Sequence, residues 1–321
     1  MAHEITIREN GYAEMAFVGD LPWHGLGQEL DANADMTTWR KAAGMDWTIE
    51  QAPVEYRAAG IGNMHYDGRF VQYRSDTGMP LSVVSERYKP VQPHEVLEFF
   101  DDLVKESGFR LHTAGTLFGG KRMWALAETG RYGEVTQGDG VGGFLLLSTS
   151  ADKSLATTAR FTSVRVVCNN TLSLAARDRS DCVSFTHSRA FDHALIKAQL
   201  GKAVESFGAF MEMAQHLQKQ RVTQEAASAF VRRLVLTNDQ LANPDYNYQK
   251  NRAYGKIINL FNGEAKGAEL VGDSKWALLN AVTEYYDHHM PARTADARLN
   301  NTWFGNGEAA KETMVELLLA A

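Results

Sequence analysis

The spacing of hydrophobic residues changes along the chain, and the change divides the sequence in two. From Trp47 to Phe185, short apolar or alternating runs end at turn residues, a pattern typical of β-strands. After Ser188, apolar residues recur every three to four positions, which predicts helices. We therefore predict an α+β fold. A mixed or antiparallel β-sheet domain with packed helices occupies residues 1–189, and a helical region occupies residues 190–321.

The strand-rich part contains one strong hairpin signal, because RSDTGMP separates two apolar runs. The predicted strands are Trp47–Val54, Arg69–Tyr73, Leu81–Val84, Arg110–Thr116, Met123–Glu128, Gly143–Ser148, Thr157–Phe161 and Val164–Cys168. The predicted helices with defined bounds are Met36–Ala43, His94–Lys105, Tyr246–Phe261, Lys275–His289 and Gly307–Leu319, and Thr37 or Thr38 is the expected cap of the first. Between the second and third of these we predict a long helix whose apolar stripe runs from Phe191 to Leu217, followed by a helix capped by Thr223.

Composition narrows the class of protein. The chain has 321 residues with 44% hydrophobic and 22% charged residues, as in ordinary globular proteins. It has two cysteines, no apolar run of about 18 residues and no basic, apolar leader. We therefore expect a soluble, cytoplasmic protein that makes no membrane contact.

Charge is distributed unevenly. The net charge of −6 argues against a strongly basic nucleic-acid binder. Residues 1–50 hold 3 Lys/Arg against 9 Asp/Glu, whereas residues 151–250 hold 13 against 9. This difference is compatible with a local anion-binding surface in the middle of the chain, or with ordinary scatter between segments.

The segment VRVVCNNTL carries an arginine in a β-branched run and then three polar residues. We predict that Asn169, Asn170 and Thr171 cap a helix that begins here. A helix N-terminus beside Arg165 favours anions. The alternative is structural, with Arg165 paired to an aspartate such as Asp178 or Asp181. The other arginines near this segment that we expect to contact phosphate are Arg160, Arg177 and Arg189.

Three further segments contain residues suited to nucleic-acid contact. STSADKS offers hydroxyl groups and Lys153 to phosphate, or it forms a polar hairpin loop. YNYQKNRAYGK interleaves Tyr248 with Lys250 and Arg252, a mixture that single-strand binding uses and that also fits a helix with a core-facing stripe. In PWHGLG, Trp23 is positioned to stack on a base or to cover the edge of a core.

One polar helix face is a possible metal site. In WALLNAVTEYYDHH, helical spacing places Glu284, Asp287 and His288 on one face. Two carboxylates and an imidazole suit a divalent metal or acid–base chemistry. The alternative is a solvated or inter-helix hydrogen-bonding face. No other cofactor is indicated, because the chain lacks a Walker motif and a GxGxxG sequence.

Several separated motifs resemble the phage/plasmid-like proteins of the domain-of-unknown-function 932 family, in order over nearly the whole chain. The resemblance implies a setting on bacterial mobile elements and no established chemistry. Thr149, Ala151 and Lys153 replace residues that the family leads us to expect as Asn, His and Gly, so a histidine-dependent role for that loop is not expected. His187 matches the family position, whereas Ser188 replaces a threonine. The motifs are PWHGLG, SVVSERYKPVQ (Ser82–Gln92), TAGTLFGGKRMWALA (Thr113–Ala127), STSADKS (Ser148–Ser154), VRVVCNNTL, FTHSRAF, NAVTEYYDH and RLNNTWFG (Arg298–Gly305).

Three hypotheses follow. The first is a DNA-handling protein that binds single strands as a homo-oligomer and anneals them during recombination. The order of elements also loosely resembles that of single-strand annealing recombinases. The second is a metal-dependent enzyme acting on a phosphorylated or nucleotide substrate. The third is a non-catalytic module that inhibits a host protein through the acidic residues 1–50.

Overall fold

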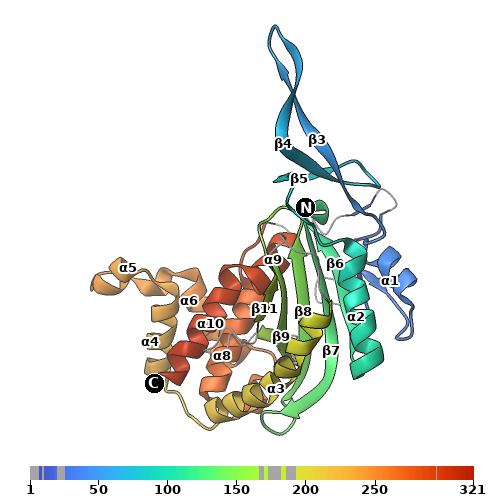
Figure 1. The fold of residues 1–321 in the computed structure, drawn as a ribbon. Helices are drawn as coiled ribbons and strands as arrows, with labels where there is room; N and C mark the ends of the chain where they lie inside the picture. Colours follow the sequence, from blue (N-terminus) through green and yellow to red (C-terminus); the bar gives the residue numbers. More distant parts are fainter. Residues whose placement is uncertain are drawn as a thin grey trace. The chain divides into compact units, whose positions relative to one another are not determined.

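Two β-sheets account for the strand-rich part of the chain (Figure 1). The computed structural model describes residues 7–8, 11–19, 26–165, 170–172, 182–185, 193–293 and 295–321. The larger sheet has eight strands in the order β10-β9-β8-β7-β6-β1-β2, with β11 also paired to β9; the smaller has the order β3-β4-β5. The strands are β1 (Met15–Phe17), β2 (Gln28–Glu29), β3 (Ile49–Ala58), β4 (Gly62–Arg74), β5 (Pro80–Ser85), β6 (Arg110–Leu117), β7 (Arg122–Glu134), β8 (Gly140–Ser150), β9 (Thr157–Arg165), β10 (Asn170–Leu172) and β11 (Cys182–Phe185).

In the described part of the chain, the helices include one in each predicted segment, in the predicted order, and three that were not predicted. The helices are α1 (Met36–Ala42), α2 (Pro93–Ser107), α3 (His193–Gln218), α4 (Gln224–Val235), α5 (Asn238–Ala242), α6 (Arg252–Asn259), α7 (Ala268–Val271), α8 (Lys275–Glu284), α9 (Ala295–Phe304) and α10 (Asn306–Leu319). Short 3₁₀ turns lie at η1 (Phe118–Gly120) and η3 (Tyr248–Lys250), and π-helical turns at η4 (Leu260–Glu264) and η5 (Tyr285–His289). The α+β class with a helical C-terminal region is confirmed.

Two interleaved units make up the chain. Unit 1 contains residues 1–130, 145–160 and 182–201, and unit 2 contains residues 131–144, 161–181 and 202–321. Strands β7, β8 and β9 contribute residues to both. The predicted boundary at residue 189 separates strand-rich from helical sequence, but the units do not divide there.

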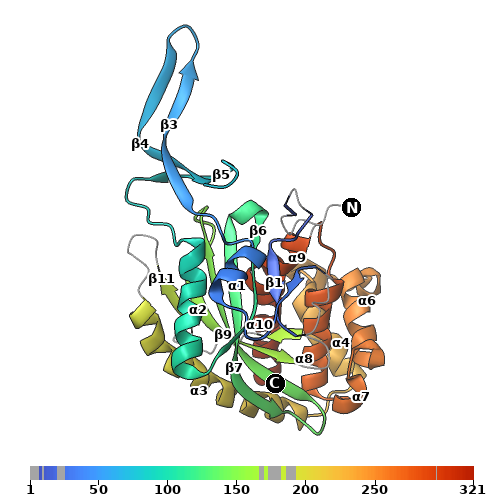
Figure 2. The same ribbon diagram turned by 90° about the vertical axis from the view of Figure 1, so that its right-hand side faces the viewer.

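Unit 1 is built around the sheet strands β6, β1 and β2 and the separate sheet β3-β4-β5. Helix α1 packs against α2, and α2 against β6 (Figure 2). Val96, Leu97, Phe99 and Phe100 are fully buried on α2 because they recur at helical spacing. These packed elements support the loops described below.

Unit 2 has an aromatic core. Phe210 lies between Phe161 and Trp276, with ring centroids 6.4 and 6.1 Å away. The Trp276 Nε1 donates a 2.8 Å hydrogen bond to Asp139, which satisfies the buried indole. Among the described residues, no helix combines the length and apolar character that crossing a membrane requires.

Several predicted boundaries were wrong for identifiable reasons. The cap of α1 is Asp35, whose side chain accepts from the Thr38 N–H at 2.7 Å, and not Thr37 or Thr38. Thr223 caps α4 as predicted. The predicted helix over 246–261 is broken, because Asn251 caps a new helix by accepting from the Tyr254 N–H.

The largest correction concerns Asn170 and Thr171. They do not begin a helix; they lie in β10, which pairs antiparallel with the Ser163–Arg165 end of β9. Pairing with an available strand edge outweighs the local capping preference of Asn and Thr here. The two strands predicted at 157–161 and 164–168 share the single strand β9, which ends at Arg165 in the described part.

Candidate anion-binding site in unit 1

Two turns of unit 1 meet beside the end of β5. One turn, residues 118–121, joins β6 to β7, which begins at Arg122, and the other, residues 151–156, joins β8 to β9. The Ala151 N–H donates to the Lys121 carbonyl at 2.8 Å, and Lys153 Nζ donates to the Val83 carbonyl at 2.8 Å. We call Val83, Phe118, Arg122, Asp152, Lys153 and Ser154 the turn cluster.

Both turns contain an unusual backbone conformation. Phe118 has φ 55° and Lys153 has φ 64°, and they are the only non-glycine residues with positive φ in the described part of the chain. This conformation costs of order 1–3 kcal/mol per residue, so the surrounding contacts must hold it. The Arg122 guanidinium lies 5.7 Å from the centroid of the Phe118 ring, and Val83 holds the Lys153 side chain. Such strain often marks a binding site.

Arg122 is oriented by a hydroxyl group and not by a carboxylate. Its Nε and Nη2 donate to the Ser154 Oγ at 3.1 and 3.0 Å. Ser154 is itself fixed by Asp152, whose Oδ1 accepts from the Ser154 N–H at 2.9 Å and from its hydroxyl group. The Arg122 Nη1 has no hydrogen-bond partner among the described residues. It remains available to an anion.

The electrostatic environment of the turn cluster favours anion binding. Burial lowers the pKa of Arg122 from its ordinary value, although the nearby Asp152 charge acts in the opposite direction. Neither Arg122 nor Lys153 has an ion-pair partner within 4 Å among the described residues. Their charges are therefore only partly balanced, and a bound anion would balance them.

The segment that contains Ser82 and Tyr88 is hydrogen-bonded to the end of β8 and to the turn that follows it. The Ser82 Oγ donates to the Ala151 carbonyl at 2.7 Å, and the Tyr88 hydroxyl donates to the Ser150 carbonyl at 3.0 Å. Burial raises the pKa of Tyr88, and the Asp152 charge raises it further. Three of the motifs identified in the sequence, Ser82–Gln92, Thr113–Ala127 and Ser148–Ser154, therefore converge here.

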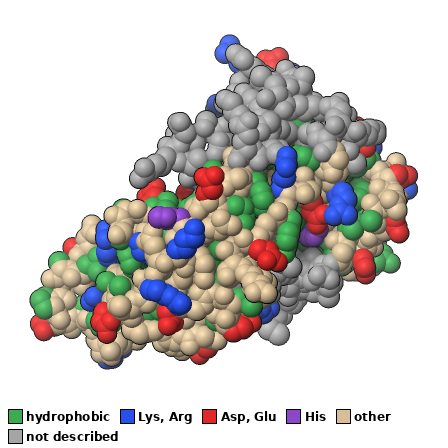
Figure 3. Space-filling model, turned by 90° about the horizontal axis from the view of Figure 1, so that it is seen from below, with side chains coloured by type: hydrophobic (Ala, Val, Ile, Leu, Met, Phe, Trp, Pro, Cys, Tyr) green, Lys and Arg blue, Asp and Glu red, His purple; other side chains and the backbone are tan. Residues whose placement is uncertain are grey.

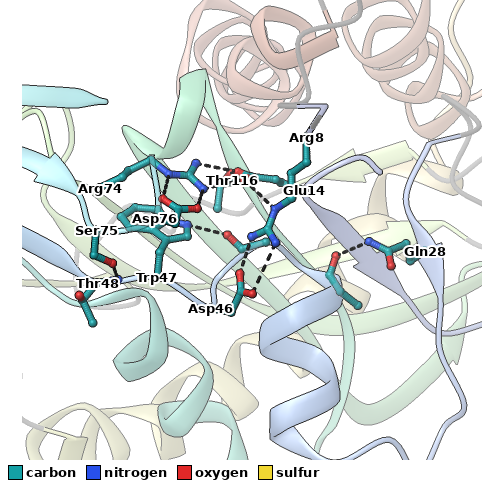
Figure 4. Close-up of polar contacts among 12 residues, drawn as sticks. Arg8, Glu14, Gln28, Asp46, Trp47, Thr48, Arg74, Ser75, Asp76 and Thr116 are labelled. Atoms are coloured by element: carbon teal, nitrogen blue, oxygen red, sulfur yellow. Dashed lines mark hydrogen bonds and ion pairs between the residues drawn. The ribbon is translucent and has the colours of Figure 1, made fainter. Parts of the chain in front are cut away.

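A buried charged network supports this site from one side (Figure 4). The Glu14 carboxylate accepts from Arg74 Nη1 and Nη2 at 3.0 and 2.7 Å, from Arg8 at 3.2 Å and from the Thr116 hydroxyl group. Arg74 is 2% exposed and Glu14 is 1% exposed. Arg74 also donates to both oxygens of Asp76, at 2.9 and 2.8 Å. We call Arg8, Glu14, Arg74, Asp76 and Thr116, with Asp46 bound to Arg8, the charged network.

The charged network is connected to the turn cluster through one arginine. Arg74 Nη1 donates to the Gly119 carbonyl at 3.3 Å, and its guanidinium lies 4.3 Å from the centroid of the Trp47 ring. At Gly120 (φ +91°), a Cβ atom would lie 2.6 Å from Trp47 and 3.2 Å from Arg74 Nη1. Only glycine fits there. The network therefore fixes the turn that carries Phe118.

The other predicted nucleic-acid residues are scattered. Arg160 is half-buried on β9 opposite Cys182. One face of the Tyr248 ring is covered by the Arg232 guanidinium at 4.8 Å, and its ring packs against Tyr254. The exposed residues Lys250 and Arg252 lie in η3 and at the start of α6 in unit 2. Outside the described residues or side chains lie Trp23, Arg165, Asn169, Arg177 and Arg189.

The predicted metal face is buried and already hydrogen-bonded. Asp287 forms a 2.9 Å ion pair with Lys311, both nearly inaccessible to solvent. Glu284 accepts from the Lys266 backbone N–H at 3.0 Å. Within the described ranges, no three His, Cys, Asp or Glu side chains gather as metal ligands, so Glu284, Asp287 and His288 do not form a cluster. Of the two alternatives, an inter-helix hydrogen-bonding face agrees with the bond from Lys311 of α10 to Asp287 of η5, whereas a solvated face does not, because Glu284 is 3% and Asp287 2% exposed.

No broad basic stripe marks the surface drawn in Figure 3. Over the coloured residues of that face, Lys and Arg side chains are interspersed with Asp and Glu. On this face, charge alone does not single out an anion-binding surface.

A family model described as "Domain of unknown function (DUF932)" matches residues 80–303, more than two thirds of the chain. The chain belongs to the DUF932 family. No curated protein and no solved structure matches it. The DUF932 segment contains every residue of the turn cluster, whereas Glu14, Arg74 and most of the β3-β4-β5 sheet precede it.

Proposed function

We propose that this DUF932 protein binds single-stranded DNA by its phosphate backbone at the turn cluster, and that it works as a homo-oligomer in strand annealing or recombination. One observation carries the proposal. The half-buried Arg122, oriented by Ser154 and lacking a carboxylate partner within ion-pair distance among the described residues, begins β7 directly after the turn next to that of Lys153.

The chemistry of these groups suits a phosphodiester. An arginine Nη1 and a lysine ammonium are common donors to phosphate oxygens, whereas the Ser154 hydroxyl group already donates to Asp152 and serves to orient Arg122. Contacts to phosphate are independent of base sequence, which suits a protein that pairs arbitrary strands. The proposed preference for single strands rests on the order of elements, which loosely resembles that of single-strand annealing recombinases. Arg160, Arg165, Arg177 and Arg189 are further residues that we propose to contact phosphate.

The test compares two pairs of charges in the full chain. Binding of a fluorescent oligothymidine is measured by anisotropy at low salt for the wild type, for Arg122→Gln/Lys153→Gln, and for Lys250→Gln/Arg252→Gln. Both double variants remove two positive charges, so the change in net charge is matched. We expect the turn-cluster variant to lose about 10- to 100-fold in affinity, because two charge-assisted hydrogen bonds to phosphate are removed, and the control to lose less than about threefold.

Two results would count against the proposal. One is a wild type that does not bind the oligonucleotide even at low salt. The other is an equal loss in the two variants, which would indicate attraction by net charge alone.

A further inference from the structure

The outer part of the β3–β4 hairpin is a two-stranded ribbon that extends beyond β5 (Figures 1 and 2). Strand β5 pairs only with residues 69–73 of β4. A register shift after Pro53 places Pro53 opposite Phe70 but Val54 opposite Tyr66. We call residues 54–66 the outer ribbon. Isolated two-stranded ribbons are marginally stable in water, so this ribbon lacks the support that a third strand gives.

One face of the outer ribbon is apolar. Side chains alternate between faces along a strand, and cross-strand partners share a face. Tyr56 is opposite Met64, and Val54 is opposite Tyr66, so these four lie on one face together with Ala58. Tyr56 is 49% exposed and Tyr66 is 56% exposed. A contiguous exposed apolar face of this kind indicates an interaction surface.

The opposite face is polar and carries both signs of charge. It contains Glu55 opposite His65, whose Nδ1 lies 3.6 Å from the Glu55 Oε1, and Arg57 opposite Asn63. Glu55 and Arg57 flank Tyr56 in the sequence Val54-Glu55-Tyr56-Arg57-Ala58. The segment is therefore symmetric in residue type about Tyr56, with an apolar residue at each end. The two charged positions beside Tyr56 have opposite signs.

Strand β3 is at the edge of its sheet, since among the described residues it pairs only with β4. An edge strand offers unpaired N–H and C=O groups to another strand. If two copies of β3 pair antiparallel about Tyr56, Glu55 of each copy lies opposite Arg57 of the other. Tyr56 then meets Tyr56, and Val54 meets Ala58. The charges are complementary for a second copy of this same segment.

We propose that the outer ribbon joins two copies of this chain, with their β3 edges paired antiparallel about Tyr56, so that the two outer ribbons form four adjacent strands. Such an interface is isologous and closes with two copies. Two Glu55–Arg57 pairs set the register on one face. On the other face, Tyr56, Met64 and Tyr66 of both copies form a single apolar surface. The outer ribbon precedes residue 80, where the match to the DUF932 model begins, so the proposed interface lies outside the matched segment.

The test exchanges the charges at Glu55 and Arg57 and measures the molecular mass of the protein in solution. Sedimentation velocity is measured on the full chain over a range of concentrations, without nucleic acid, so the result does not depend on the proposed DNA binding. The wild type should dimerise. Glu55→Arg or Arg57→Glu alone places like charges opposite each other and should weaken the dimer at least about tenfold. The double variant Glu55→Arg/Arg57→Glu restores the pairing and should restore the dimer. Arg69→Glu, an exposed charge on β4 outside the outer ribbon, is the control and should not change the mass.

Cross-linking gives an independent readout of the register. Under mild oxidation Tyr56→Cys should form a disulfide-linked dimer, whereas Ile61→Cys at the 76% exposed tip, with the same native cysteines, should not. The proposal is overturned by a wild type that stays monomeric at all concentrations, or by a double exchange that fails to restore the dimer. It is also overturned if Glu55→Arg strengthens oligonucleotide binding without any change in mass, which would assign the ribbon to DNA.

Discussion

The charged network and the turn cluster are neighbouring groups of charges in unit 1, and they differ in how their arginines are partnered. In the charged network, Arg74 has two carboxylate partners and is almost fully buried. In the turn cluster, Arg122 contacts only a hydroxyl group and an aromatic ring among the described residues. The two are linked through the Gly119 carbonyl. The comparison suggests that the first group fixes the structure and that the second is left open for a ligand.

The largest expected effect comes from breaking the charged network. Arg74→Ala leaves the buried Glu14 carboxylate without its main partner, and removing one member of a buried pair costs about 3–5 kcal/mol. The free energy of unfolding in urea measures this. Arg69→Ala, an exposed arginine on the same strand, is the control and should change stability by less than about 0.5 kcal/mol. A small effect of Arg74→Ala would show that the network is not structural.

Unit 2 contains a comparable buried pair, which sharpens the distinction between structural and ligand-binding charges. Lys311→Ala should destabilise the chain by about 3 kcal/mol or more, because Asp287 then stays buried without its cation. Thermal unfolding measures this loss, and Lys250→Ala is the exposed control. If Asp287 instead served a bound metal, Lys311→Ala would be tolerated once Mn²⁺ or Mg²⁺ was added.

A smaller effect is expected from pH. Burial raises the pKa of Asp76, but its hydrogen bonds with Arg74 and the arginine's charge outweigh burial, so the pKa is below the ordinary 3.8. A lowered folded pKa stabilises the chain above pH 3.8, and this contribution is lost as the pH falls through the folded value. Asp76→Asn should therefore be less stable than the wild type at pH 7, with the difference shrinking below pH 4. Chemical unfolding at several pH values tests this; a difference independent of pH would contradict it.

The smallest effect on stability is expected in the turn cluster. Arg122→Gln removes a charge that has no carboxylate within ion-pair distance among the described residues, so the free energy of unfolding should change by less than about 1 kcal/mol. A loss as large as that of Arg74→Ala would make Arg122 a structural residue and remove the contrast between the two groups.

The sequence predicted the α+β class and most elements, because hydrophobic period and capping residues are local signals. Thr223 is an example, since its hydroxyl group accepts from the Ala226 N–H, three residues away in the chain. The strand at Asn170–Leu172 was missed because its partner β9 decides its conformation, and no local pattern reveals that pairing. The interleaving of the two units is likewise a property of long-range contacts.

Only part of the site could be predicted. Lys153 was identified from its hydroxyl-rich segment, but Arg122 was not, because its neighbour Ser154 is 32 residues away in the sequence. A signal was present in Phe118-Gly119-Gly120, where two glycines before a lysine and an arginine indicate a tight turn. The burial of Asp287 against Lys311 could not be predicted, because helical spacing gives the shared face but not what packs on it.

The salt dependence of single-strand binding tests the central claim most directly. For the wild type, log K should fall linearly with log salt concentration, with a slope of about −0.7 for each phosphate neutralised on a single strand. In Arg122→Gln/Lys153→Gln the slope should be shallower by roughly 0.7 for each phosphate that is no longer neutralised, whereas Lys250→Gln/Arg252→Gln should keep the wild-type slope. An unchanged slope in the turn-cluster variant would contradict the assignment of the turn cluster as the phosphate-binding site.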